Sequence, residues 1–290
     1  MIMEYIIFDL EWNNAFNYRT KKGINEIIEI GAVKLNDDFE VVDTFKQLIY
    51  PRLSKKLGSN FKKLTHITME EIRAEGISFD EAFADFSRWS RGSNVVFLSW
   101  SNSDLYTLAD NYKRFKNTSD VEFMHYYADA QSYCMQFIND HNGSQISLSR
   151  CAEKFGVDVD TAKFHRALED CFVTAYCLKK VFDKDKFSKF IVKCDAGFFE
   201  RLVFKSYFIN KPVYGDFDVN KVELKCPACS GSVSPFGKYE FNNNTFRNSG
   251  VCSECGKKFW LFVRAKQTYD ELIVTQRLVA INKKRARFIN

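Results

Sequence analysis

The chain has 290 residues, 46% of them hydrophobic, which is enough for one large domain with an appendage or for two domains. No apolar run approaches the ~20 residues of a membrane span, and nothing near the N-terminus resembles a signal peptide. We therefore expect a cytoplasmic protein with no membrane partner, and the nine cysteines of such a chain argue against a disulfide framework.

The net charge of +5 is unevenly distributed. Residues 184–290 contain 20 Lys and Arg and 10 Asp and Glu, which leaves 22 and 27 in residues 1–183. A basic part beside an acidic part indicates that one part holds a polyanion and the other processes it. A solvated, Lys-rich surface would give the same charge balance.

The first predicted element is a buried strand over Tyr5–Glu11, an apolar run rich in β-branched residues. Residues two apart share one face of a strand, so Asp9 and Glu11 present two carboxylates side by side. The polar residues 13–25 are typical of a loop, and strands over residues 26–35 and 40–50 would complete an antiparallel meander.

Alternating helices and strands follow. Capping patterns open helices at Thr68 and at Ser78, a buried strand covers residues 95–99, and a helix over residues 104–115 carries Asp104 in its first turn. Helical stretches are also expected near residues 130–138 and 147–155. The order of elements predicts an α/β domain with a mixed central sheet flanked by helices.

A long helix is predicted from Arg166 to Phe182, where apolar residues recur at steps of three and four. Asp170 lies at the edge of this apolar stripe, and burying its carboxylate alone would be costly unless the carboxylate binds a metal ion. Five helical residues turn by about 140°, so His165 must lie on the loop before the helix to share a site with Asp170.

The ordered set of Asp9 and Glu11, then Asp104, then His165 with Asp170, resembles the DEDDh family of 3′ to 5′ exonucleases over residues 4–182. Residues 26–33 and 64–72 are similar to further parts of the family. The resemblance implies a ribonuclease H-like fold and an enzyme that hydrolyses phosphodiester bonds at single-stranded 3′ ends of nucleic acid, with RNA slightly favoured over DNA. It also implies two Mg²⁺ or Mn²⁺ ions held by the four carboxylates, with His165 as general base on the attacking water.

The chain departs from the family where Trp12-Asn13-Asn14 follows Glu11, because many members have Thr or Ser there. Trp12 and Asn13 are candidates to contact the terminal base or sugar, and a packing role for Trp12 fits equally well. Taken singly, the acids fit a solvated strand end or a helix N-terminus. The alternative function is a non-catalytic, exonuclease-like protein that binds nucleic acid or docks onto a complex.

Two Cys-x-x-Cys pairs, separated by 22 residues, predict one structural Zn²⁺ held by Cys226, Cys229, Cys252 and Cys255. Reduced core cysteines or a redox pair are the alternatives. Strands are expected over residues 238–246, 259–265 and 271–281, so this part resembles a zinc ribbon. Its basic and aromatic residues could hold a phosphate backbone, and they are Lys257, Lys258, Trp260, Phe262, Arg264 and the basic tail 283–287. Docking of a protein partner is the alternative for the ribbon residues, and surface solubility is the alternative for the tail.

We accordingly expect three parts: an exonuclease domain over residues 1–185, a helical connector over 186–221, and a zinc-ribbon module with a basic tail over 222–290. Within the connector, residues 196–208 are the candidate helix, and Pro212 and Gly215 indicate irregular chain.

Overall fold

The structure is a computed structural model that describes residues 3–17, 21–92, 94–139, 143–158 and 165–281. The chain separates into two compact units, the first ending at Val203 and the second beginning at Phe204. The division falls inside the segment 186–221 that the sequence suggested as a connector. No helix in the described ranges is both long and apolar enough to cross a bilayer.

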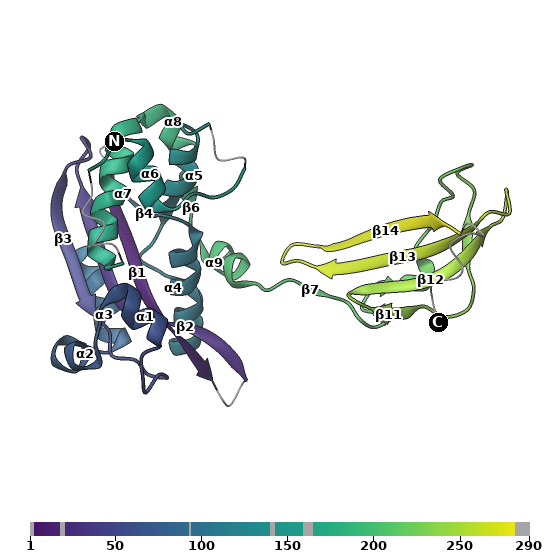
Figure 1. The fold of residues 1–290 in the computed structure, drawn as a ribbon, viewed down its shortest axis with the longest axis horizontal. Helices are drawn as coiled ribbons and strands as arrows, with labels where there is room; N and C mark the ends of the chain where they lie inside the picture. The colour runs from purple at the N-terminus through teal and green to yellow at the C-terminus, as the bar shows by residue number, and fades with distance from the viewer. Residues whose placement is uncertain (1–2, 18–20, 93, 140–142, 159–164, 282–290) are drawn as a thin grey trace. The chain divides into compact units, whose positions relative to one another are not determined.

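The described part of the first unit is built on a six-stranded sheet with the order β3-β2-β1-β4-β5-β6 (Figure 1). The three N-terminal strands pair antiparallel, β1 is parallel to β4 and β4 to β5, and β6 is antiparallel to β5. The predicted mixed sheet is therefore confirmed. The strands are β1 (Glu4–Asn17), β2 (Lys22–Leu35), β3 (Val41–Leu48), β4 (Val95–Ser99), β5 (Tyr126–Asp129) and β6 (Val192–Lys193).

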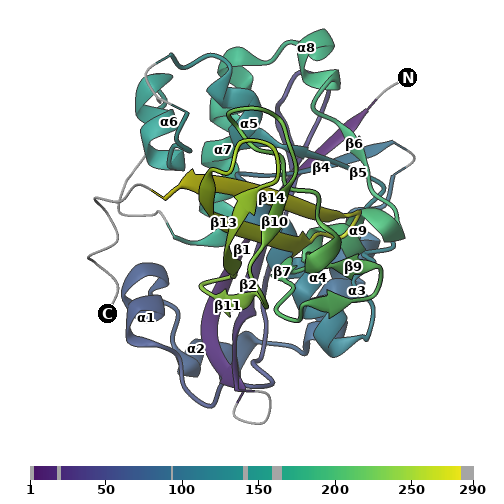
Figure 2. The same cartoon turned by 90° about the vertical axis from the view of Figure 1, so that its right-hand side faces the viewer.

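Helices cover both faces of this sheet because successive side chains of β1 point to opposite sides. Ile6 and Phe8 pack with α3 (Phe79–Trp89), α4 (Asn102–Phe115) and α9 (Ala196–Val203). Tyr5 and Ile7 pack into a second core with the helices grouped together in Figures 1 and 2, which are α5 (Ala130–Met135), α6 (Leu148–Lys154), α7 (Ala167–Val181) and α8 (Lys184–Ser188). Two short helices, α1 (Ser59–Thr65) and α2 (Met69–Glu75), pack near Ile28 and Leu48.

The prediction of a loop over residues 13–25 is wrong, because β1 and β2 continue as a hairpin through this polar segment up to Asn17 and from Lys22. Ala15 pairs with Ile24, and both side chains are buried. The polar side chains fit because they bind the loop after β3. The Asn13 Oδ1 accepts from the N–H of Gly58 at 2.8 Å, and the Glu26 carboxylate accepts three backbone N–H groups of residues 52–54.

Helix α7 lies directly on β2, with no side chain between the two backbones at Gly31. A Cβ atom at Gly31 would lie 2.2 Å from the backbone nitrogen of Leu168, which is far inside van der Waals contact. One turn further, the thiol of Cys171 lies 3.3 Å from the Gly31 carbonyl oxygen. Glycine is therefore required for this approach.

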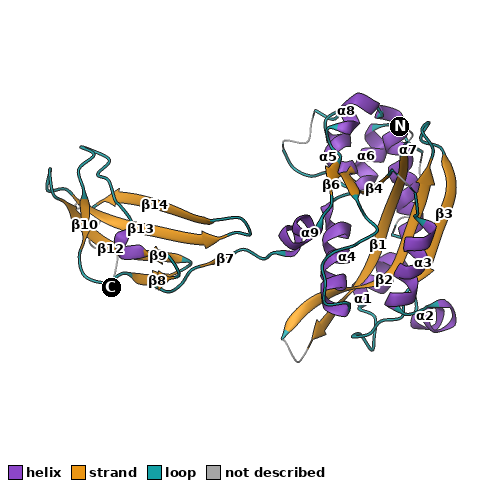
Figure 3. Cartoon of the chain, turned by 180° about the vertical axis from the view of Figure 1, so that it is seen from behind, coloured by secondary structure: helices purple, strands orange, loops and turns teal. Residues whose placement is uncertain are grey.

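The second unit contains a sheet with the order β10-β12-β13-β14 (Figure 3), and β11 pairs with β12 and β7 with β13. The strands are β7 (Tyr207–Phe208), β10 (Val233–Pro235), β11 (Glu240–Asn242), β12 (Thr245–Cys252), β13 (Lys258–Gln267) and β14 (Leu272–Ala280), with β8 (Val213–Tyr214) and β9 (Phe217–Asp218) forming a separate pair.

Two predictions in the C-terminal part are wrong in their boundaries. The expected strand over residues 238–246 is a hairpin, because Asn243 and Asn244 have positive φ angles and reverse the chain between β11 and β12. The candidate helix over residues 196–208 ends at Val203, and Tyr207 and Phe208 pair with β13 instead. The basic tail 283–287 lies outside the described residues.

Candidate active site

Asp9 and Glu11 lie near the middle of β1, on the face that α7 covers. Their side chains alternate with those of Phe8 and Leu10, which point into the opposite core. The parallel pairing of β1 with β4 extends only to Ile7 opposite Leu98. A register shift between Glu11 and Trp12 then breaks the antiparallel pairing with β2. The two acids thus stand where one neighbouring strand has ended and the strand itself is irregular.

Asp170 in the first turn of α7 completes a group of three carboxylates. One oxygen from each of Asp9, Glu11 and Asp170 lies within 4.8 Å of the others. The backbone N–H of His165 donates to Asp170 Oδ2 at 3.3 Å, which fixes the carboxylate relative to the loop before the helix. Asp170 Oδ1 is buried and has no hydrogen-bond partner within the described residues, so it is an open ligand position.

Asp104 contacts β1 from the helix that follows β4. Asp104 is only 5% exposed and lies in the first turn of α4, as the sequence predicts. Its Oδ1 accepts from the backbone N–H of Leu10 at 3.2 Å, beyond the end of the β4 pairing. Asp104 is not among the three converging carboxylates, although it acts on them through its charge.

The pKa values of these acids are raised by burial and by their mutual repulsion, which the charge of Arg166 offsets only in part at Glu11. Burial, followed by repulsion from Asp104 and Glu11, raises the pKa of Asp9 well above its usual range. Burial, followed by repulsion from Asp170, raises the pKa of Glu11 to about 9. Burial likewise raises the pKa of both Asp104 and Asp170 to about 7. In the described part of the chain none of the four forms an ion pair with Lys or Arg.

This donor set fits divalent metal ions. Hard cations such as Mg²⁺ and Mn²⁺ bind carboxylate oxygens, and each such ion would offset the repulsion that raises the pKa values. The open Oδ1 of Asp170 and the convergence of three oxygens agree with that use.

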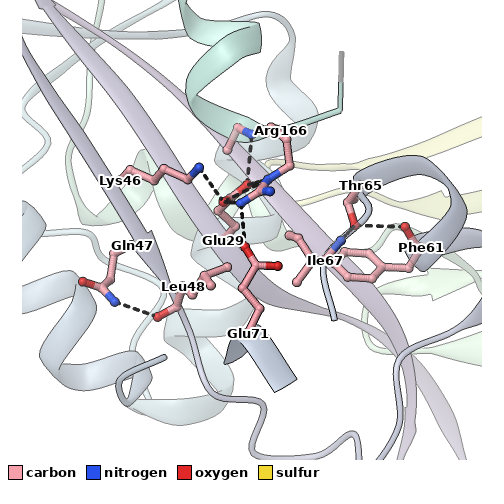
Figure 4. A network of polar contacts seen from close by, with 10 residues as sticks. Glu29, Lys46, Gln47, Leu48, Phe61, Thr65, Ile67, Glu71 and Arg166 are labelled. Atoms are coloured by element: carbon pink, nitrogen blue, oxygen red, sulfur yellow. Dashed lines mark hydrogen bonds and ion pairs between the residues drawn. The ribbon is translucent and has the colours of Figure 1, made fainter. Parts of the chain in front are cut away.

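Glu29 and Arg166 form an ion pair that the sequence did not suggest (Figure 4). Glu29 on β2 is fully buried and lies opposite Glu11 in the register. The Arg166 guanidinium donates to both oxygens of Glu29, with the shortest distance 2.7 Å, and to Glu71 at 3.2 Å. The N–H of Ala167 also donates to Glu29 at 3.2 Å, so this pair anchors the N-terminus of α7. The partners are 137 residues apart, and no local pattern links them.

His165 lies in the loop ahead of α7, where the geometric argument from the sequence requires it. Its φ angle is 71°, in the left-handed region that non-glycine residues seldom adopt, and its side chain is exposed. A strained backbone at an exposed histidine beside a carboxylate site is typical of functional residues.

Trp12 and Asn13 differ in their surroundings. Trp12 is partly buried and packs against the first core. Asn13 is 1% exposed, and its amide donates to Ser54 Oγ at 2.9 Å while its carbonyl oxygen accepts from the N–H of Gly58. The amide of Asn13 therefore holds the loop after β3, and its predicted contact with substrate stays a prediction.

The four cysteines of the second unit converge as their spacing predicts. Their sulfur atoms all lie within 4.8 Å of one another, with 3.7 Å between Cys226 and Cys255 and 3.5 Å between Cys229 and Cys252. Tetrahedral Zn–S bonds of about 2.3 Å place sulfur atoms nearly 4 Å apart, so the residues fit one Zn²⁺. Hydrogen bonds from the backbone N–H of Cys255 lower the pKa of Cys252 to about 7, which favours a thiolate ligand.

Comparison with known proteins identifies the family of the first unit. The exonuclease family RNase T matches residues 6–178. A probable 3′–5′ exonuclease, KapD of Bacillus subtilis (strain 168), is 31% identical over 182 residues, which are 62% of this chain and 85% of that protein. The solved nuclease domain of 3′hExo, a DEDDh family member bound to rAMP, is similar in fold with a TM-score of 0.52 at 22% identity, covering 61% of this chain and 90% of that domain.

A third similar structure is the zinc-bound complex of Escherichia coli ExoI with single-stranded DNA. Its TM-score is 0.50 at 14% identity, and the match covers 86% of this chain and 54% of that chain. At this identity the similarity concerns the fold alone.

Proposed function

This chain belongs to the RNase T family of exonucleases and is a 3′–5′ exonuclease of the DEDDh type, and from that premise we propose that it shortens single-stranded RNA by a two-metal mechanism. The observation that supports the mechanism is the convergence of Asp9, Glu11 and Asp170, none of which forms an ion pair with Lys or Arg in the described part of the chain. Asp104 adds a fourth carboxylate that acts on the same group.

In this proposal Asp9, Glu11, Asp104 and Asp170 hold two Mg²⁺ or Mn²⁺ ions. When bound, such ions lower the pKa of a water molecule and neutralise charge on the leaving oxygen of a phosphodiester. The residues of the chain would position the carboxylates that hold these ions. The N–H of Leu10 orients Asp104, and the N–H of His165 orients Asp170.

We assign proton abstraction from the attacking water to His165. An imidazole exchanges protons near neutral pH, and general-base catalysis contributes typically about 10²- to 10⁴-fold to a rate. The exposed side chain can reach substrate from the loop, while its backbone N–H remains bonded to Asp170. The same loop carries Arg166, whose pairing with Glu29 limits how far His165 can move.

RNA is the preferred substrate in this proposal because the 3′hExo nuclease domain, which has a similar fold, binds rAMP. Trp12 follows the metal-binding part of β1 directly, so its partly exposed ring would stack on the terminal base. Asn13 would act indirectly by holding the loop at residues 54–58.

The test follows single-stranded RNA and DNA of one sequence, each labelled at the 5′ end, in MgCl₂ or MnCl₂. We expect a ladder of products shortened by single nucleotides, faster with RNA, and no ladder with Asp9→Ala. His165→Ala should lower kcat by about 10²- to 10⁴-fold, whereas the matched control His125→Ala, also exposed, should leave kcat unchanged. Equal kcat for wild type and Asp9→Ala would refute the mechanism.

For the second unit we propose one structural Zn²⁺ held by Cys226, Cys229, Cys252 and Cys255, since their sulfur atoms converge.

The division of the chain into three parts at residues 185 and 221 remains our proposal, and limited proteolysis would test it. The five other cysteines are buried and unpaired, which suits a reducing compartment, and we propose that the protein acts in the cytoplasm.

A further inference from the structure

One face of the second unit's sheet is open and carries a regular array of arginine and aromatic side chains. The register places Arg247 of β12 opposite Phe262 of β13, and Phe262 opposite Arg277 of β14. The neighbouring row runs from Ser249 through Trp260 to Val279. Alternate residues of β13 on the other face are buried in the core of the unit, namely Phe259, Leu261, Val263 and Ala265. We call the open side the arginine face.

Aromatic rings on the arginine face are exposed to an extent that packing does not explain. Trp260 is 42% exposed although it lies on the central strand β13. Phe236, which follows β10, is 49% exposed, and its N–H donates to the carbonyl oxygen of Ser249 at 2.7 Å. That bond puts Phe236 in the same row as Trp260. Large side chains are normally drawn into the core, so two exposed rings in one row indicate a binding surface.

The arginines of the arginine face are not held in ion pairs in the part of the chain that the structure describes, although Glu240 of β11 lies opposite Arg247 in the register. Arg247, Arg264 and Arg277 surround a hollow on the sheet together with Phe262 and Thr275. Within the described residues none of the three forms an ion pair with a carboxylate. The segment 204–290 contains 15 Lys and Arg and 7 Asp and Glu, so the surroundings are basic as well.

Two of the arginines are held in place for a ligand. The Nε of Arg264 donates to Thr245 Oγ1 at 2.8 Å, which leaves its terminal nitrogens for other partners. The guanidinium carbon of Arg277 lies 4.8 Å from the centre of the Phe262 ring, a cation–π contact that orients the group over the sheet. Because these two side chains are already ordered, less conformational entropy is lost when a ligand binds.

We propose that the arginine face binds single-stranded nucleic acid, with bases stacked on Trp260 and Phe236 and phosphates held by Arg247, Arg264 and Arg277. Unpaired bases are required because stacking on a protein ring needs an open base face. Arginine is the residue that best matches phosphate oxygens in a planar, bidentate contact. The inference rests on the proposed function for the identity of the polymer, and it assigns to the second unit a binding site apart from the carboxylates.

The binding test uses the full chain, loaded with Zn²⁺ and dialysed free of Mg²⁺ and Mn²⁺, so that no hydrolysis accompanies binding. Fluorescence anisotropy of labelled U12 and dT12 gives Kd as a function of salt. Trp260→Ala should raise Kd about tenfold through the loss of one stacked base. Arg247→Ala and Arg277→Ala should each raise Kd severalfold and reduce the slope of log Kd against log salt by about one.

Two matched controls lie elsewhere on the unit. Lys221→Ala removes one exposed charge near Val274, whose side chain is on the opposite face of β14 from Arg277, and Tyr214→Ala removes an exposed ring in the same region. Both should leave Kd and the salt slope unchanged. Zinc content and thermal unfolding of every variant report whether the unit remains folded.

Equal Kd values for Trp260→Ala, Arg277→Ala and the two controls would overturn the proposal. Failure of wild type to bind either oligonucleotide, with binding of an acidic protein instead, would also overturn it. The proposed function fails separately, through a missing product ladder. If the chain binds U12 through the arginine face but does not shorten it, this inference stands and the proposed function fails. If the chain shortens U12 and the KM of Trp260→Ala and Arg277→Ala is unchanged, this inference is wrong.

Discussion

Replacing Glu11 by Gln should stabilise the metal-free fold at alkaline pH. The pKa of Glu11 is raised from 4.5 to about 9, first by burial and then by the charge of Asp170. A raised pKa in the folded state means that the folded chain keeps a proton that the unfolded chain releases above about pH 4.5. Stability is therefore complete below that pH and is lost progressively as pH rises toward 9. A neutral amide at this position cannot contribute to that loss.

The size of the effect follows from the same shift. Between pH 5 and pH 8 a single group with these pKa values would cost the folded state about 4 kcal/mol, at 1.36 kcal/mol for each pH unit. The neighbouring acids share protons with Glu11, so about 4 kcal/mol is the upper limit for this one site. In a unit of this size each kcal/mol shifts Tm by roughly 2–4 °C, so Glu11→Gln should raise Tm at pH 8 by at most roughly 8–16 °C and should change it little at pH 5.

Urea unfolding followed by circular dichroism at 222 nm measures this difference, because every α-helix in the described ranges ends by Val203 and thus reports on the first unit. Glu153→Gln, at an exposed position of α6, is the matched control and should behave as wild type at both pH values. Added MnCl₂ should reverse the order, because wild type gains the free energy of metal binding and Glu11→Gln loses a ligand. The reasoning is refuted if Glu11→Gln destabilises the metal-free chain equally at pH 5 and pH 8.

Three further predictions concern single contacts. Arg166→Ala should lower the free energy of unfolding by about 3 kcal/mol, because the buried Glu29 loses its closest cation and keeps only the more distant Lys46, and an unchanged urea midpoint would contradict this. Asn13→Ala should cost about 1–2 kcal/mol through the unpaired N–H of Gly58; a raised KM at full stability would instead identify Asn13 as a direct substrate contact. Cys252→Ser should abolish binding of one Zn²⁺ per chain and unfold the second unit, while the helical signal of the first unit persists; retained stoichiometric zinc would disprove the four-cysteine site.

The sequence predicts the elements that carry the acids because their patterns are local. Alternation in the first strand placed Asp9 and Glu11 on one face, and the helical period placed Asp170 at the edge of a buried stripe while excluding His165 from the helix. The turn at Asn243 and Asn244 was also visible in principle, since two asparagines in succession favour positive φ angles.

Other features could not be predicted because they depend on distant partners. Residues 13–25 have the composition of a polar loop, and they form a hairpin because backbone N–H groups of the loop at residues 52–58 donate to Asn13 and to the neighbouring Glu26. Glu29 and Arg166 have no sequence pattern that joins them, and each alone resembles a surface charge. The arginine face depends on the register of three strands, which a single sequence does not fix.

The bare backbone contact at Gly31 has a consequence for the order in which the active site is assembled. The carbonyl of Gly31 and the thiol of Cys171 are 140 residues apart in the chain, so α7 joins the sheet only after nearly the whole first unit has been synthesised. A growing chain that already contains Asp9, Glu11 and Asp104 still lacks Asp170. If the carboxylates act together as proposed, the growing chain has no complete active site until synthesis has passed Asp170 and α7 has packed on the sheet.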